Sequence, residues 1–164
     1  MINSNEVMPL ITFEGRVPSE WLDYNGHMNV SYYSMAFDQG IDEIFEEILG
    51  IGATYTKSAR MGPYVLQNNL HYLDELLEGA NFSVQLTLLD HDAKRMHVFL
   101  EMFNESGGLA ATSEQLLMNV DLTTRRSAPY PDAVLTLLSE LQAGHDRLTK
   151  SKHIGAPLGI RRKG

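Results

Sequence analysis

The sequence predicts an α+β fold in which one long helix packs against an antiparallel sheet of about five strands. Two observations predict this class. Residues 30–49 carry apolar side chains at steps of three and four, the period of an amphipathic helix. The stretches that follow alternate apolar and polar residues, and short turn-rich segments separate them. Strands joined by hairpins after a helix indicate an antiparallel sheet rather than parallel βαβ units.

The first part of the chain supplies one strand and the long helix. Alternation over residues 11–17 predicts a short strand, which Pro18 ends. Asn29 is a good N-cap for the helix, because its side-chain oxygen can accept a hydrogen bond from the first turn. Gly50 suits the position just after the helix. Residues 52–62 have no clear period and are expected to form a loop.

A meander of four further strands is expected next. These strands are predicted at residues 64–72, 80–88, 96–103 and 109–122. The last of them carries on one face Leu116, Met118, Val120 and Leu122. Proline at the first turn predicts a C-terminal helix over about residues 131–144. One long helix leaves an edge and the second face of the sheet in need of cover, which predicts a homodimer or a homotetramer.

Composition and charge narrow the class of protein. The length of 164 residues argues for a single domain over residues 1–164, and 43% hydrophobic residues are enough for a core. The net charge of −8 disfavours nucleic acid as a partner. Without cysteine there is no disulfide and no thiolate chemistry. No apolar run is long enough to span a membrane, and Met1–Glu6 lack the features of a signal peptide, so we expect a cytoplasmic protein.

Basic residues are concentrated near the C-terminus. Residues 147–164 form a basic tail, and Arg125 and Arg126 lie just upstream. A local basic rim on an acidic body would suit a small polyanion such as a nucleotide-bearing ligand. The alternative, favoured for a terminal segment, is a solvated tail.

The stretch Asp23–Val30 holds the residues that point to chemistry. It places a carboxylate, a glycine turn, a histidine and a helix cap within eight residues. The N-terminus of a helix offers N–H groups and the positive end of its dipole to an anion, or to an oxygen that becomes one. Asp23 beside such an end could attack an activated carbonyl. The alternative is that Asp23 is an ordinary turn residue.

One known family has a signature similar to Asp23-x-x-Gly26-His27-Met28-Asn29 followed by Tyr33 and Phe37. Over about residues 8–126 the chain resembles the 4-hydroxybenzoyl-CoA-thioesterase-like branch of the hotdog-fold proteins. The resemblance implies a long helix wrapped by a curved antiparallel sheet, paired subunits and an active site between them. It also implies that Asp23 is the catalytic acid and that the Val30 N–H polarises the carbonyl. Many relatives have asparagine in place of Val30, but only a main-chain donor is needed there.

The motif also resembles, more closely, thioesterases of carnitine breakdown, among them betainyl-CoA thioesterases, over Trp21–Asn29 and the tyrosines that follow. The substrate of those enzymes carries a quaternary ammonium. Aromatic faces bind such cations with about 0.5–2 kcal/mol per ring when desolvated, and four aromatic residues crowd this motif. The predicted substrate-binding residues are Trp21, Tyr24, Asn29, Tyr32, Tyr33 and Asn69.

Several of these assignments have structural alternatives. Asp23 could be a nucleophile that forms a mixed anhydride or a general base that activates water. His27 could act as a base or hold the loop by hydrogen bonds, and Asn25 could contact the acyl carbonyl or only form the turn. Tyr33 could be plain core. Asn69 could line the acyl pocket or lie on the wet side of the sheet.

Arg95, Arg125 and Arg126 are candidate contacts for the phosphates of coenzyme A. We expect no metal and no cofactor apart from the CoA of the substrate, because Asp90–Asp92 lie in a hairpin loop without a spaced partner. The predicted function is hydrolysis of a short-chain acyl-CoA, with a trimethylammonium-bearing (betainyl-type) acyl group as the candidate substrate. The alternatives are an acyl-carrier-protein thioesterase, a hotdog dehydratase and a non-catalytic acyl-CoA-binding protein.

Overall fold

The computed structural model describes residues 9–162 of the chain. Its elements are β1 (Leu10–Arg16), the short 3-10 helix η1 (Ser19–Trp21), α1 (Val30–Glu47), α2 (Ala53–Ala59), β2 (Met61–Tyr72), β3 (Asn81–His91), β4 (Arg95–Asn104), β5 (Leu109–Asp121), β6 (Arg126–Ser127) and α3 (Asp132–His145). The segment Met1–Glu6, on which the signal-peptide prediction depends, lies outside the described residues, and so does Lys163 of the basic tail. Within residues 9–162, none of the helices has the length and hydrophobicity that a bilayer span requires.

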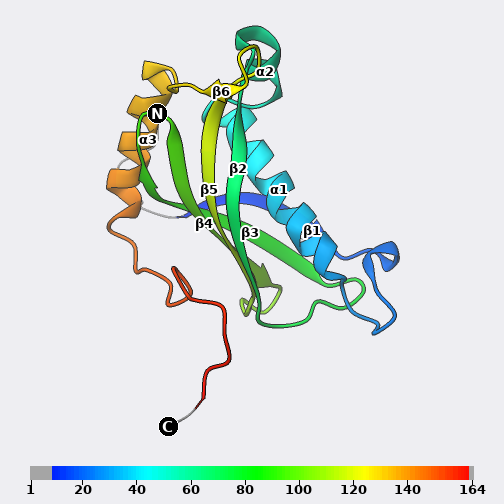
Figure 1. The fold of residues 1–164 in the computed structure, drawn as a ribbon. Coiled ribbons are helices and arrows are strands. Elements are labelled where there is room, and N and C mark those ends of the chain that lie inside the picture. The colour runs from blue at the N-terminus through cyan, green and yellow to red at the C-terminus, as the bar shows by residue number, and fades with distance from the viewer. Residues whose placement is uncertain (1–8, 163–164) are drawn as a thin grey trace.

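One antiparallel sheet curls beside α1, as Figure 1 shows. Its strands lie in the order β1-β3-β4-β5-β2, and β6 pairs with β5. Helix α1 lies on one side of this sheet and α3 on the other (Figure 1). The predicted α+β class, the long helix and the curved antiparallel sheet are confirmed.

The position of β2 corrects the predicted order of the strands. Instead of continuing into a four-stranded meander, β2 pairs with β5 at the far edge of the sheet. Only β3, β4 and β5 follow one another as a meander. Residues 73–80 therefore cross from one part of the sheet to another, and their local pattern resembles that of a turn. As a result, β1 and β2 form the two edges.

Helix α1 approaches the sheet closely. Its buried face includes Phe37, Ile41 and Ile44 at helical spacing. A side chain at Gly40 would collide with the Thr12 hydroxyl of β1, so a glycine allows this approach. The apolar face predicted for residues 30–49 is the face that packs on the sheet, and the helix ends at Glu47.

Residues 52–62 were expected to form a loop, and this prediction is wrong because Ala53–Ala59 form α2. The Glu46 carboxylate accepts hydrogen bonds from the Thr54 N–H (3.1 Å) and from the Thr54 hydroxyl. A carboxylate from α1 thus supplies the N-terminal acceptor of α2, and Tyr55 is buried beneath it. Seven residues are too few for a helical period to be recognised in the sequence.

The C-terminal part of the chain covers the outer face of the sheet, opposite α1. Helix α3 extends to His145, past the predicted end at Gly144. The buried His145 side chain accepts a hydrogen bond at Nδ1 from the Leu88 N–H (2.9 Å). Farther on, the Gly155 N–H donates to Glu114 Oε2 (2.7 Å). The interpretation of residues 147–164 as a solvated tail is therefore wrong where the chain crosses β5.

The face of β5 that is buried toward α1 is not the face that its apolar pattern in the sequence indicates. The face with Leu116 and Met118 is half-buried on the outer side. The more polar face, with Ser113 and Gln115, is buried on the side of α1. Gln115 Nε2 donates to Ser113 Oγ (2.9 Å), and Ser113 Oγ donates to Asn68 Oδ1 (2.8 Å). These bonds allow polar side chains to occupy the inner face.

Candidate active site

A tight loop carries Asp23 to the start of α1. The Asp23 N–H donates to the His27 carbonyl oxygen (3.0 Å), and the Gly26 N–H donates to the Asp23 carbonyl oxygen (3.0 Å). The Asn25 N–H donates to Asp23 Oδ1 (2.8 Å), which forms an Asx turn. Gly26 has a φ of 80°, in the left-handed region that favours glycine. The local sequence thus specifies where the carboxylate of Asp23 lies.

The N-terminus of α1 is capped as predicted and remains open to a ligand. Asn29 Oδ1 accepts a hydrogen bond from the Ser31 N–H (2.9 Å), and the Asn29 N–H donates to the Trp21 carbonyl oxygen (2.9 Å). Among the described residues, no acceptor is recorded for the Val30 N–H, and Val30 is 56% exposed. The first main-chain donor of an 18-residue helix thus has no acceptor within the described part of the chain.

His27 lies between two carboxylates. Its Nε2 is 3.6 Å from Asp23 Oδ2, and its Nδ1 is 3.1 Å from Glu75 Oε2. The side chain of Asp23 is 15% exposed, and that of His27 is 36% exposed. An imidazole in this position can orient the Asp23 carboxylate and exchange a proton with it. Sequence reasoning missed Glu75, and the only signal was its place in the acidic turn after β2.

Tyr33 ties the site loop to the segment after β2. Its hydroxyl donates to the Asp74 carbonyl oxygen (3.3 Å) and accepts from the Leu76 N–H (3.1 Å). Burial raises the pKa of Tyr33 above its usual value, so the hydroxyl keeps its proton. In the same region the Met28 N–H donates to the Leu76 carbonyl oxygen (2.8 Å). Tyr33 is therefore a core residue that supports the loop.

Substitution Tyr33→Phe should lower the free energy of unfolding by about 1–2 kcal/mol, because it leaves a buried N–H and a carbonyl without their partner. Urea denaturation measures this change. The matched control is Tyr24→Phe, since Tyr24 is 98% exposed and its variant should unfold like the wild type. Equal midpoints for the Tyr33 variant and the wild type would contradict the supporting role.

The four aromatic residues of the motif do not form a cage within one chain. Trp21 and Tyr32 stack on each other, with ring centroids 5.1 Å apart and an interplanar angle of 9°. Tyr33 packs edge-on against Tyr72 in the core (5.4 Å). Tyr24 projects into solvent from the turn. One chain therefore presents these rings separately.

The remaining predicted residues lie on other parts of the surface. Asn69 is on the outer face of the sheet, where its Nδ2 donates to the Ala156 carbonyl oxygen (3.2 Å), away from α1. Arg95 Nε donates to Asp92 Oδ2 (2.8 Å) across the β3–β4 hairpin. Hydrogen bonds from Arg95 and from Lys94 N–H lower the pKa of Asp92 to about 2. The run Asp90–Asp92 is thus part of a hydrogen-bonded turn, and no metal-binding group of His and acidic side chains occurs among residues 9–162.

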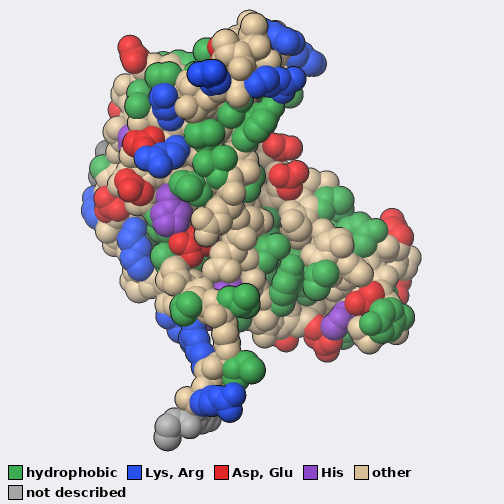
Figure 2. Space-filling model, viewed as in Figure 1, with side chains coloured by type: hydrophobic (Ala, Val, Ile, Leu, Met, Phe, Trp, Pro, Cys, Tyr) green, Lys and Arg blue, Asp and Glu red, His purple; other side chains and the backbone are tan. Residues whose placement is uncertain are grey.

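Arg125 and Arg126 lie near the α2 end of the molecule, where Lys and Arg side chains gather (Figure 2). Arg125 Nη1 donates to the Tyr64 hydroxyl (3.1 Å). The neighbouring cations Lys57 and Arg60 belong to α2 and its C-cap. Tyr64 also lines the cavity between α1, α2 and β2, so Arg125 lies close to its wall.

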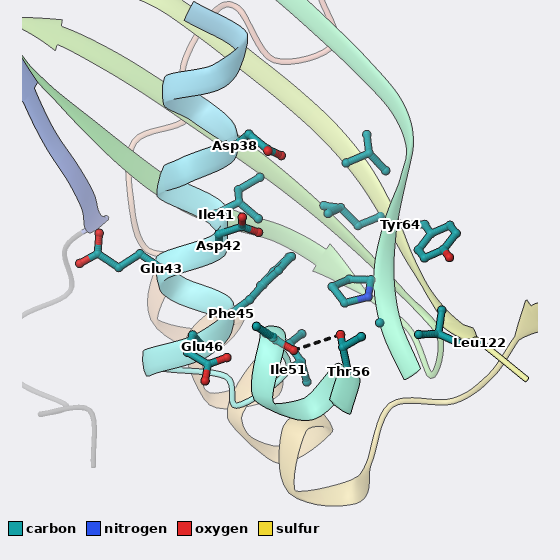
Figure 3. A pocket seen from close by; sticks show the side chains of 16 residues that line it. Asp38, Ile41, Asp42, Glu43, Phe45, Glu46, Ile51, Thr56, Tyr64 and Leu122 are labelled. Atoms are coloured by element: carbon teal, nitrogen blue, oxygen red, sulfur yellow. Dashed lines mark hydrogen bonds between the residues drawn. The ribbon is translucent and has the colours of Figure 1, made fainter. Parts of the chain in front are cut away.

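The cavity between α1, α2 and β2 is open and has a volume of about 630 Å³. Its walls include Asp38, Asp42, Phe45, Val65 and Leu117 (Figure 3). Asp23 is not among the residues that line it. Asp38 and Asp42 lie eight and twelve positions after Val30, so they lie about 12 and 18 Å along the helix from the N-terminal donor of the same chain. The cavity is thus beside the C-terminal half of α1, whereas Asp23 precedes its N-terminus.

The position of Asp42 on α1 is expected to lower the free energy of unfolding at neutral pH, and denaturation measurements can detect this effect. Burial, and next Asp38, raise the pKa of Asp42 above 3.8. The pKa of Asp42 is therefore higher in the folded than in the unfolded protein. The protonated carboxyl group contributes stability that is fully present below pH 3.8, and this contribution is lost as the pH rises through the folded-state pKa and the group ionises. Asp42→Asn should therefore raise the free energy of unfolding by about 0.2–0.5 kcal/mol at pH 7. Denaturation near pH 3 should show no gain, and an equal gain at both pH values would contradict this assignment.

The model of the thioesterase-like superfamily matches residues 17–138 of this sequence. The chain belongs to this superfamily. The hotdog fold expected from the resemblance is thereby confirmed, together with the class of enzyme, a thioester hydrolase.

Among curated relatives, this thioesterase is 34% identical over 152 residues to a betainyl-CoA thioesterase of Pseudomonas aeruginosa, covering 92% of this chain and 95% of the relative. It is 37% identical over 139 residues to an L-carnitine dehydrogenase/betainyl-CoA thioesterase of Ruegeria pomeroyi. That match covers 83% of this chain but 28% of the Ruegeria protein, so the similarity is to one part of a longer polypeptide.

Solved structures agree with the fold of this thioesterase. A Staphylococcus aureus protein in complex with CoA superimposes with a TM-score of 0.87 and 28% identity, covering 96% of this chain and 99% of that one. A 1,4-dihydroxy-2-naphthoyl-CoA thioesterase from Synechocystis has a TM-score of 0.71 at 18% identity, over 80% of this chain and 96% of its own. The second likeness concerns the fold alone.

Proposed function

We propose that this thioesterase hydrolyses betainyl-CoA, or a closely related short acyl-CoA with a trimethylammonium group, to the free acid and CoA. The observation that carries the proposal is the Asp23 carboxylate, held by hydrogen bonds in the loop that leads into α1, whose first N–H, that of Val30, has no acceptor among the described residues. The betainyl-CoA thioesterase relative, similar over nearly its whole length, supports the choice of acyl group.

In the proposed reaction the thioester oxygen accepts a hydrogen bond from the Val30 N–H. As a general base, Asp23 takes a proton from water while the water oxygen bonds to the acyl carbon. The negative charge that develops on the thioester oxygen is stabilised by the N–H and by the helix dipole. Collapse breaks the carbon–sulfur bond, and the CoA thiolate leaves and gains a proton. In the nucleophilic alternative Asp23 itself bonds to the acyl carbon, and water then hydrolyses the mixed anhydride.

We assign His27 a positioning role within this reaction. The imidazole contacts Asp23 on one side and Glu75 on the other. It can hold the carboxylate facing the start of α1 and share the proton that Asp23 receives. Asn25 acts through its N–H, which fixes Asp23 Oδ1.

A pair of chains joined along β2 would complete the site. This edge strand is 12 residues long and exposes Tyr64, Val65, Leu66 and Tyr72 to between 43% and 49%. A long, apolar, unpaired edge is a template for pairing with another strand. Antiparallel pairing of two such edges about a twofold axis sets the two α1 helices side by side in opposite directions. The Asp23 of one chain would then lie toward the cavity of the other, and the proposed enzyme is a homodimer at least.

The basic cluster near α2 is the proposed contact for the phosphates of CoA, since its Arg125 hydrogen-bonds to Tyr64 of the cavity wall. It comprises the predicted Arg125 and Arg126 together with Lys57 and Arg60. Arg95 is a weaker candidate because its guanidinium is paired with Asp92. Guanidinium groups suit phosphate recognition, and a position outside the cavity leaves its interior for the acyl end.

Thiol release from a panel of substrates tests the proposal. The panel contains betainyl-CoA, acetyl-CoA, benzoyl-CoA, a trans-2-enoyl-CoA and an acylated carrier protein. We expect the highest kcat/KM for betainyl-CoA. Faster release from the carrier protein, or hydration of the enoyl-CoA without release of thiol, would replace the proposal with one of the other hotdog activities. Binding of CoA esters without any thiol release would indicate a non-catalytic protein.

A further inference from the structure

Two carboxylates project together into the cavity beside α1. Asp38 and Asp42 are one helical turn apart, so they lie on the same face of α1. Figure 3 shows both side chains extending toward β2, on the side where Phe45 also points, whereas Glu43 extends the opposite way. None of the ion pairs formed among the described residues includes Asp38 or Asp42. Two like charges therefore face one space without a cation from the chain itself.

The rest of the cavity wall is mainly apolar, and it also includes the polar side chains of Glu46, Thr56 and Tyr64. Ile41 and Phe45 of α1 are buried, and Val65 and Leu117 face them from the sheet. The charged side chains that line the cavity are all acidic.

This combination favours one class of ligand. An anion is repelled by the carboxylates, and a neutral acyl chain would leave them unpaired. A metal ion requires several oxygen ligands held close together, and among residues 9–162 no group of three or more His or acidic side chains is placed to bind one. A quaternary ammonium has no N–H donors and is coated with methyl groups. It can therefore pack on apolar walls while its charge is balanced by nearby carboxylates.

We propose that Asp38 and Asp42 form the subsite that binds the trimethylammonium group of the acyl moiety and selects it over neutral acyl groups. This inference rests on the proposed function and on the pairing of chains along β2. The acyl group of betainyl-CoA has a single methylene between carbonyl and nitrogen, far shorter than the distances of about 12 and 18 Å along α1 from Asp38 and Asp42 to the Val30 N–H of the same chain. The carbonyl thus belongs at the α1 N-terminus of the second chain, while the cation occupies this cavity.

The experiment compares two substrates that differ in one atom. Betainyl-CoA and tert-butylacetyl-CoA have the same shape, but carbon replaces the charged nitrogen in the second. Purified full-length protein is assayed as the wild type, as the double variant Asp38→Asn/Asp42→Asn, and as Glu47→Gln. The last is the matched control, since it removes one charge from the same helix outside the cavity.

We expect the wild type to prefer betainyl-CoA, and the ratio of the two kcat/KM values to fall about tenfold or more in the double variant. The Glu47 variant should keep the wild-type ratio. If the double variant keeps that ratio while the wild type hydrolyses betainyl-CoA, the subsite is overturned and the proposed function stands. If the wild type releases thiol from neither substrate, the proposed function fails and the subsite fails with it.

Discussion

Replacement of Asp23 by asparagine is expected to lower kcat for betainyl-CoA by about a hundred- to a thousandfold, the range that a general base or acid contributes. The amide has the shape of the carboxylate but can neither accept a proton from water nor attack the thioester. Its Oδ1 can still accept the hydrogen bond from the Asn25 N–H, so the loop should keep its conformation. Thiol release under saturating substrate measures the effect, and circular dichroism checks the fold.

The control for this substitution is Glu20→Gln, which neutralises an exposed acid of η1 close to the motif. It should keep wild-type turnover. A folded Asp23→Asn protein with full activity would remove Asp23 from the mechanism. A single turnover in isotopically labelled water then separates the two roles of Asp23 in the wild type. Label in the Asp23 side chain identifies the mixed anhydride, because only water that attacks its aspartyl carbon leaves an oxygen atom in Asp23.

Leu66→Lys on the edge strand β2 is expected to separate the chains and to reduce kcat/KM about a hundredfold. Leu66 is 49% exposed. A lysine there would place a charge in the proposed interface between the β2 strands of the two chains. Without the second chain, the cavity has no Asp23 close by and each Asp23 has no acyl pocket. Size-exclusion chromatography with light scattering reports the mass, and the thiol assay reports activity.

The matched control is Leu158→Lys, which changes a fully exposed leucine outside the sheet in the same way. It should leave mass and activity at wild-type values. A Leu66 variant that is monomeric yet fully active would show that one chain suffices, and it would overturn the composite site. A wild type that is itself monomeric at assay concentration and active would do the same.

The features that could be predicted from the sequence are those that local patterns encode. The helix cap at Asn29, the turn at Gly26 and the Asp23 loop all follow from side chains and backbone within a few positions. The meander β3–β5 follows from alternation and hairpin turns. Local hydrogen bonds and periodicity act over short separations, so they leave a signature in the sequence.

The features that could not be predicted depend on contacts between distant segments. Helix α2 is stabilised by Glu46 of the preceding helix. Glu75 reaches His27 only because the chain crosses the sheet after β2. The cavity exists because α1, α2 and β2 enclose it together, and the acids of α1 resembled an ordinary solvated face until the position of β2 was known. The spacing of residues along the sequence cannot predict contacts between such distant segments.

The pairing of β2 with β5 has a consequence for the order in which the chain folds. Met61 pairs with Asp121, and Tyr72 pairs with Ala111, so this ladder closes a long loop, whereas β3, β4 and β5 close short ones. During synthesis, β2 emerges well before its neighbour in the sheet exists. We therefore expect β2 to join the sheet late, after the meander has formed. The edge that we propose for pairing with a second chain would then exist only on chains whose sheets are already complete.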